Sequence, residues 1–242
     1  MTARGFLLAL GLLWPIAGGA TQPCPLPPDF SEAARPLPAV SQALERGPLR
    51  ILVLGSASVA GGAASAPEAS WPAQLEAQLS QRYPGRTLEM TVRGGRGVTV
   101  QDHLALLRAA DSERPALVIW QAGTVEATRG MDPDEMTEAL QIGLDSIRRH
   151  GADAVLIEPQ FSRFLRANSN IEPYREKMRL AAAGAGAPLF RRWDLMQHWV
   201  ENGGPDLERT PRQQRAATAD RLNQCIARGL AELIVQGVNE AR

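Results

Sequence analysis

Short apolar runs alternate with longer segments of helical periodicity along most of the chain. The first run, Ile51 to Leu54, stops at Gly55, and later runs are similarly bounded by turn residues. Short bounded runs of this kind are typical of strands buried on both faces of a parallel sheet. The pattern predicts an α/β fold with a parallel five-stranded sheet that is covered by helices on both faces. We expect strands at residues 51–54, 87–92, 115–121, 154–157 and 188–190. We expect helices at residues 39–46, 71–83, 98–110, from 132 or 134 to 150, 172–183 and 213–235.

The N-terminal segment has a different pattern from the rest of the chain. Arg4 precedes an apolar run at residues 5–16, and small residues follow up to Ala20. That order predicts a secretory signal peptide at residues 1–20, because the apolar run is too short to span a bilayer. An uncleaved anchor is the alternative. Residues 21–48 are rich in proline and are expected to wrap over one domain formed by residues 49–242. The chain is therefore expected in the periplasm or outside the cell, with no transmembrane segment after cleavage.

Composition narrows the classes of partner. The 26 basic and 26 acidic residues balance, so the net charge gives no reason to expect nucleic acid or an acidic membrane as a partner. No metal-ligand spacing or dinucleotide fingerprint occurs, and neither a metal nor a cofactor is expected. Cys24 and Cys225 are the two cysteines. In an oxidising compartment they are a candidate disulfide, and two separate thiols are the alternative.

Three glycine-containing turns follow the first three predicted strands. They are Gly55-Ser56-Ala57-Ser58, residues 93–99 (Arg-Gly-Gly-Arg-Gly-Val-Thr) and residues 121–127 (Gln-Ala-Gly-Thr-Val-Glu-Ala). Ligands of open α/β sheets bind beyond the carboxyl ends of the strands, so these turns are expected to form the site.

In this order, the three turns resemble those of the SGNH hydrolases, also called the GDSL lipase/esterase family. The sequence Trp-Gln-Ala-Gly-Thr at residues 120–124 is similar to the third block of a secreted bacterial branch, and both cysteines have counterparts there. The resemblance implies a three-layer α/β/α, flavodoxin-like fold and the hydrolysis of acyl esters. In that family, a serine of the first block attacks the ester carbonyl, and a histidine of a C-terminal Asp-x-x-His motif takes the serine's proton. The first-block backbone, a second-block glycine and a third-block asparagine stabilise the oxyanion.

The chain departs from this pattern at nearly every catalytic position. Ala57 stands at the position of the nucleophile, and Val125 at that of the oxyanion asparagine, while Gly94 retains the glycine role. Glu126 replaces the aspartate that follows the asparagine; it is expected to be a solvated loop carboxylate or an ion-pair partner of Arg93 or Arg96. The positions of the C-terminal Asp and His fall on Gln214 and Ala217 or, in a second register, the histidine position falls on Arg209.

Neighbouring residues offer only partial replacements. Ser56 and Ser58 flank Ala57, and His103 is the histidine expected nearest the site. A displaced hydroxyl is a poor substitute, because a misplacement of about 1 Å can cost a hundredfold in rate. The sequence thus predicts a pseudoenzyme that binds an acylated carbohydrate or an envelope protein. The alternatives are an ester hydrolase or O-acyl transferase that uses Ser56 or Ser58, and an interaction module with a closed pocket.

Overall fold

The computed structural model describes residues 24–27, 30 and 35–242. In this part of the chain, five parallel strands form one sheet in the order β2-β1-β3-β4-β5. The strands are β1 (Leu49–Gly55), β2 (Leu88–Gly94), β3 (Leu117–Gln121), β4 (Asp153–Ile157) and β5 (Leu189–Phe190). The predicted α/β class and parallel five-stranded sheet are confirmed.

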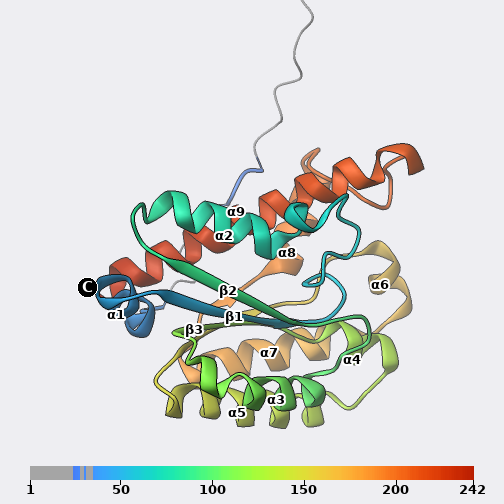
Figure 1. Cartoon of the computed structure of the whole chain (residues 1–242). Coiled ribbons are helices and arrows are strands. Elements are labelled where there is room, and N and C mark those ends of the chain that lie inside the picture. Colours follow the sequence, from blue (N-terminus) through green and yellow to red (C-terminus); the bar gives the residue numbers. More distant parts are fainter. Residues whose placement is uncertain (1–23, 28–29, 31–34) are drawn as a thin grey trace, which may run out of the picture.

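Helices cover both faces of the sheet (Figure 1). On one face, α2 (Trp71–Arg82) packs beside the long C-terminal helix α9 (Arg215–Glu240). On the other face, α5 (Pro133–Arg149) lies between α3 (Val100–Ala109) and α7 (Glu172–Ala185). The remaining helices are α1 (Pro38–Arg46), α4 (Thr124–Arg129), α6 (Arg163–Asn168) and α8 (Arg192–Glu201), with single turns at Pro67–Ala69, Asp111–Glu113 and Arg212–Gln214.

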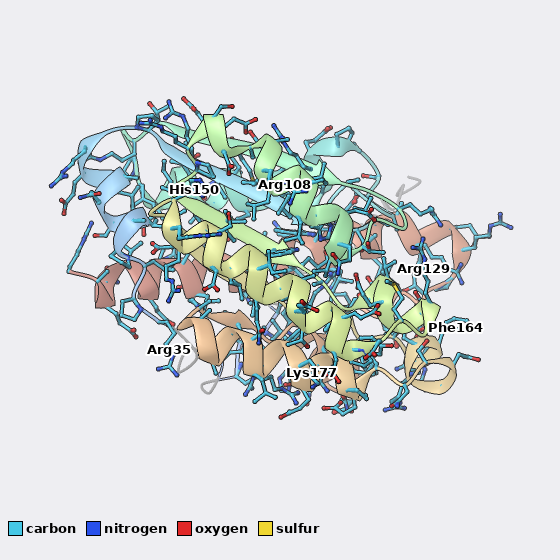
Figure 2. All side chains as sticks on the ribbon, turned by 90° about the horizontal axis from the view of Figure 1, so that it is seen from below. Arg35, Arg108, Arg129, His150, Phe164 and Lys177 are labelled. Carbon is cyan, nitrogen blue, oxygen red and sulfur yellow. A yellow bond between two sulfur atoms is a disulfide. The ribbon has the colours of Figure 1, made fainter. Side chains whose placement is uncertain are left out.

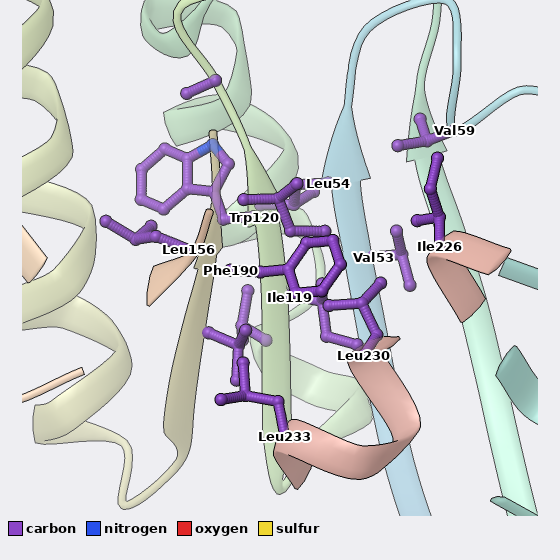
Figure 3. Close-up of a cluster of buried hydrophobic side chains, with 14 of the residues drawn as sticks. Val53, Leu54, Val59, Ile119, Trp120, Leu156, Phe190, Ile226, Leu230 and Leu233 are labelled. Atoms are coloured by element: carbon purple, nitrogen blue, oxygen red, sulfur yellow. The ribbon is translucent and has the colours of Figure 1, made fainter. Parts of the chain in front are cut away.

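The core lies on both faces of the central strands. Figure 3 shows Val53 of β1 beside Ile226 of α9, and Leu54 of the same strand toward Trp120. Alternate strand residues therefore fill opposite layers, as the period of two requires. Trp120 is accommodated by Gly143 of α5, where an added Cβ would lie 2.3 Å from the indole ring.

The Pro-rich segment joins the same core. Leu37 and Val40 are buried, and the Val40 amide at the start of α1 donates to the Asp153 carboxylate over 2.9 Å. Cys24 forms a disulfide with Cys225 of α9, with a Cα–Cα distance of 5.7 Å. The described part of this segment is thus fixed to the domain at two points. The predicted signal peptide lies outside the described residues.

The ends of several helices and strands differ from the prediction, and three helices lie in segments where none was predicted. Strand β2 continues to Gly94, because it stays in register with β1 to the Gly55–Gly94 pair. The turn after β3 contains the helix α4, which was predicted as a loop, and α6 and α8 were not predicted. Helix α9 runs to Glu240 rather than 235, because Val238 remains buried against the core. No helix among the described residues combines the length and apolarity needed to span a membrane.

Candidate functional site

The carboxyl ends of β1, β2 and β3 meet at one edge of the sheet, as predicted. The segment Ser56-Ala57-Ser58 follows β1 and is half-exposed. Gly94 closes β2 opposite Gly55 and has a φ of +130°; an added Cβ would lie 1.9 Å from the Gly55 carbonyl oxygen. A side chain at this position would therefore force the two strand ends apart.

A chain of side-chain hydrogen bonds connects three of these strand ends. The Ser58 hydroxyl donates to Gln121 Oε1 over 2.5 Å, and Gln121 Nε2 donates to Ser56 Oγ over 3.3 Å. Arg192, the first residue of α8 after β5, donates from Nη1 to Ser58 Oγ over 3.2 Å. Gln121 is buried and is a neutral amide, so it orients both serines but cannot take a proton from either.

His103 is buried away from the serines. It is 1 % exposed, and its Nδ1 accepts a 2.9 Å hydrogen bond from Trp120 Nε1. Because Nδ1 is the acceptor, the neutral ring carries its proton on Nε2, which is buried. Burial lowers the pKa of His103, and the Gly55 backbone and the Asp102 carboxylate offset this only partly. In this geometry neither ring nitrogen accepts a serine proton.

The other histidines lie elsewhere. His150 follows α5, and Figure 2 shows it with Arg108 on the face formed by α3 and α5. His198 is on α8, and its Nδ1 lies 3.3 Å from Asn202 Nδ2. Among the described residues, no hydrogen bond joins a serine hydroxyl to a histidine ring.

Glu126 was predicted as a solvated carboxylate or an arginine partner, and both interpretations are wrong. The side chain is 3 % exposed and accepts from the Val100 amide over 2.7 Å and from the Gly123 amide over 3.0 Å. It thereby joins the first turns of α3 and α4. Arg93 pairs with Glu113 instead.

The remaining positions of the resemblance hold neither the oxyanion asparagine nor the histidine of the family pattern. Val125 is half-buried in the first turn of α4 and has no side-chain donor. Gln214, Ala217 and Arg209 are all exposed, so neither C-terminal register places a base. The described residues contain no group of three or more His, Cys, Asp or Glu side chains suited to a metal ion.

A buried charge cluster after β4 was not predicted. Glu158 is fully buried, with Oε2 3.5 Å from Arg175 Nη2 and Oε1 3.4 Å from Arg179 Nε. Arg175 also pairs with Asp194 over 2.5 Å. Burial, the largest cause, raises the pKa of Glu158 to about 7, although both arginines oppose the rise. An acidic residue after a strand is an ordinary sequence feature, so its burial could not be foreseen.

A separate groove of about 1020 Å³ lies at the opposite, amino-terminal edge of the sheet. Arg46 of α1, Arg114 and His150 are among its lining residues. The groove is therefore distinct from the site at the carboxyl-terminal edge, where Ser56 and Ser58 lie.

A comparison with known protein families shows the family of this chain. The sequence profile of the non-GDSL lipase-like family matches residues 23–240, and the chain belongs to that family. No curated protein matches the chain.

Solved structures that include two carbohydrate esterases share the fold. TesA is 22 % identical, with a TM-score of 0.59 over 76 % of this chain and 99 % of its own. A two-domain esterase (CEX) active on acetylated mannans, co-crystallised with mannopentaose, is 15 % identical with a TM-score of 0.68; the match covers 88 % of this chain and 58 % of that one. A mutant of Axe2, an acetyl-xylooligosaccharide esterase from Geobacillus Stearmophilus, is 15 % identical with a TM-score of 0.58, covering 78 % of this chain and 93 % of that one. At these identities the matches establish the fold.

Proposed function

We propose that this member of the non-GDSL lipase-like family is a secreted or periplasmic pseudoenzyme that binds an acylated carbohydrate without hydrolysing it. The observation that carries the proposal is the environment of Ser56 and Ser58. Their side-chain partners are Gln121 and Arg192, and neither is a general base at neutral pH. Serine attack requires a base to remove the hydroxyl proton.

Two features support export. The first 20 residues have the sequence order of a signal peptide. The Cys24–Cys225 disulfide is of a kind that persists in oxidising compartments. On this proposal, residues 1–20 are removed and residues 21–242 remain as one domain with its Pro-rich leader.

The ligand class is suggested by fold analogy and by the polar edge. The CEX esterase acts on acetylated mannans, and Axe2 is an acetyl-xylooligosaccharide esterase. Half-exposed hydroxyls at Ser56 and Ser58 offer hydrogen bonds to a sugar or an ester carbonyl. An envelope protein is the other partner expected from the sequence.

An ester hydrolase or O-acyl transferase that uses Ser56 is the second candidate. Ser56 Oγ accepts from Gln121 but has no acceptor for its own proton among the described residues. That proton would be available to a base carried by a substrate or supplied by a partner. Ser58 is less suited, because its proton is already donated to Gln121.

The proposal is tested by isothermal titration of the mature protein with acetylated manno- and xylo-oligosaccharides. The matched ligands are the same oligosaccharides after chemical deacetylation. We expect saturable binding that weakens about tenfold without the acetyl groups, equivalent to roughly 1.4 kcal/mol. Equal affinity for both forms, or no binding of either, contradicts the proposed ligand. Release of free acetate during the titration contradicts the absence of hydrolysis.

A further inference from the structure

Arg192 is a buried cation at the edge that holds the serines. The residue is 3 % exposed and occupies the first position of α8. Burial lowers the pKa of Arg192 to about 10, which still leaves the guanidinium charged at neutral pH. The positive charge is therefore a permanent feature of this edge.

No carboxylate balances this charge. Among the described residues Arg192 forms no ion pair, and its one hydrogen bond goes to the neutral Ser58 hydroxyl. Its Nε is buried without a partner. The neighbouring Arg175 differs, because Glu158, Glu172 and Asp194 surround it. A buried charge without a partner is costly, so its presence points to a counter-ion that the folded chain does not supply.

Two donors remain for such a counter-ion. Nη2 of Arg192 has no hydrogen-bond partner among the described residues. The Ser56 hydroxyl is half-exposed and its proton has no acceptor in the same part of the chain. Gln121 and Ser58 connect the two donors and fix their orientation.

We propose that Arg192 and Ser56 bind a carboxylate of the ligand, as an acidic sugar would provide. One guanidinium balances one negative charge, which favours a carboxylate over a phosphate dianion. The inference rests on the binding role proposed above and narrows its ligand to acidic, acylated carbohydrates. Arg192 then acts as an anion-recognition residue in place of the missing catalytic groups.

The experiment measures thermal unfolding of the mature protein in sodium acetate and sodium chloride at equal ionic strength. Glucuronate against glucose is a second pair of probes. We expect the melting temperature to rise and saturate with acetate and glucuronate only. In Arg192→Met this response is lost, and the melting temperature in chloride is equal to or above that of the wild type, because an unpaired buried charge is removed. Arg108→Met, on the exposed face of α3, is the matched control and keeps the response.

Ser56→Ala provides a test that does not depend on replacing the arginine. We expect it to fold and to bind acetate about tenfold more weakly, as loss of one hydrogen bond to a charged group implies. Equal melting in acetate and chloride for the wild type, or an unchanged acetate response in both variants, overturns the inference. Tighter binding of phosphate than of acetate overturns the assignment to a carboxylate. Acetate binding without oligosaccharide binding supports the anion site and contradicts only the proposed carbohydrate ligand.

Discussion

Replacement of His103 by alanine separates a structural histidine from a catalytic one. His103 is 1 % exposed and its Nδ1 accepts the hydrogen bond of Trp120, which is itself fully buried. The variant leaves the indole N–H without a partner, at a cost of about 1–3 kcal/mol. It also leaves a cavity, and large-to-small changes in a core cost about 2–5 kcal/mol. We therefore expect a loss of about 3–8 kcal/mol, a large share of a typical domain stability of about 5–15 kcal/mol.

Urea unfolding of wild type, His103→Ala and His150→Ala measures this loss. His150 is the matched control, because its side chain is 55 % exposed and such surface changes alter stability by roughly 0.5 kcal/mol or less. His103→Gln can retain an acceptor for the indole and should lose less than the alanine variant. A loss below about 1 kcal/mol for His103→Ala would refute the structural role, since it is below the smallest expected sum.

The stability difference between wild type and His103→Ala should also depend on pH. Burial lowers the pKa of His103 in the folded protein, so below an ordinary pKa of about 6.5 the unfolded state binds the proton more readily. Wild-type stability from this group is complete above that pH and falls on acidification. The stability difference between wild type and His103→Ala should therefore shrink as the pH is lowered from about 7 to about 5.

Other groups give independent predictions. The disulfide joins Cys24 and Cys225 across 201 residues, so replacing both by serine should cost about 5 kcal/mol in the chain-entropy model; a loss below about 1 kcal/mol in urea unfolding contradicts this. Burial raises the pKa of Glu158 from 4.5 to about 7, so its contribution to stability should fall as the pH rises through that interval. The stability of Glu158→Gln should lack this dependence on pH. Parallel pH profiles of the urea midpoints of wild type and Glu158→Gln would disprove the prediction. Gly94→Ala should cost about 2 kcal/mol or more, since it combines strained φ with a backbone clash. Gly85→Ala has a φ of +78° but open space, and should cost about 1 kcal/mol; equal losses in thermal unfolding would contradict the role of the close approach.

Local pattern was sufficient to predict the sheet and the edge at which the three glycine-containing turns meet. Apolar runs that stop at glycines predicted where the chemistry-bearing turns gather, because parallel strands place their carboxyl ends at one edge. Helix α4 was missed because it is only the segment Thr124–Arg129 and begins inside a glycine turn. Its stability depends on Glu126, whose partner Val100 lies 26 residues away.

Arg192 illustrates the limit of sequence reasoning. Arg191 and Arg192 are adjacent arginines after β5, yet Arg192 is the more deeply buried of the two. Its hydrogen-bond partner Ser58 is 134 residues away, so no local pattern identifies it. Burial and long-range pairing are properties of the assembled fold, and they set the chemistry of this edge.

The proposed absence of hydrolysis is tested by turnover of p-nitrophenyl acetate and butyrate with the mature protein, Ser56→Ala and Ser58→Ala. We expect no turnover above buffer, or a slow rate that is the same in all three proteins, because neither serine contacts a base among the described residues. Turnover that falls about a hundredfold or more in either variant would show a working serine nucleophile and contradict the pseudoenzyme.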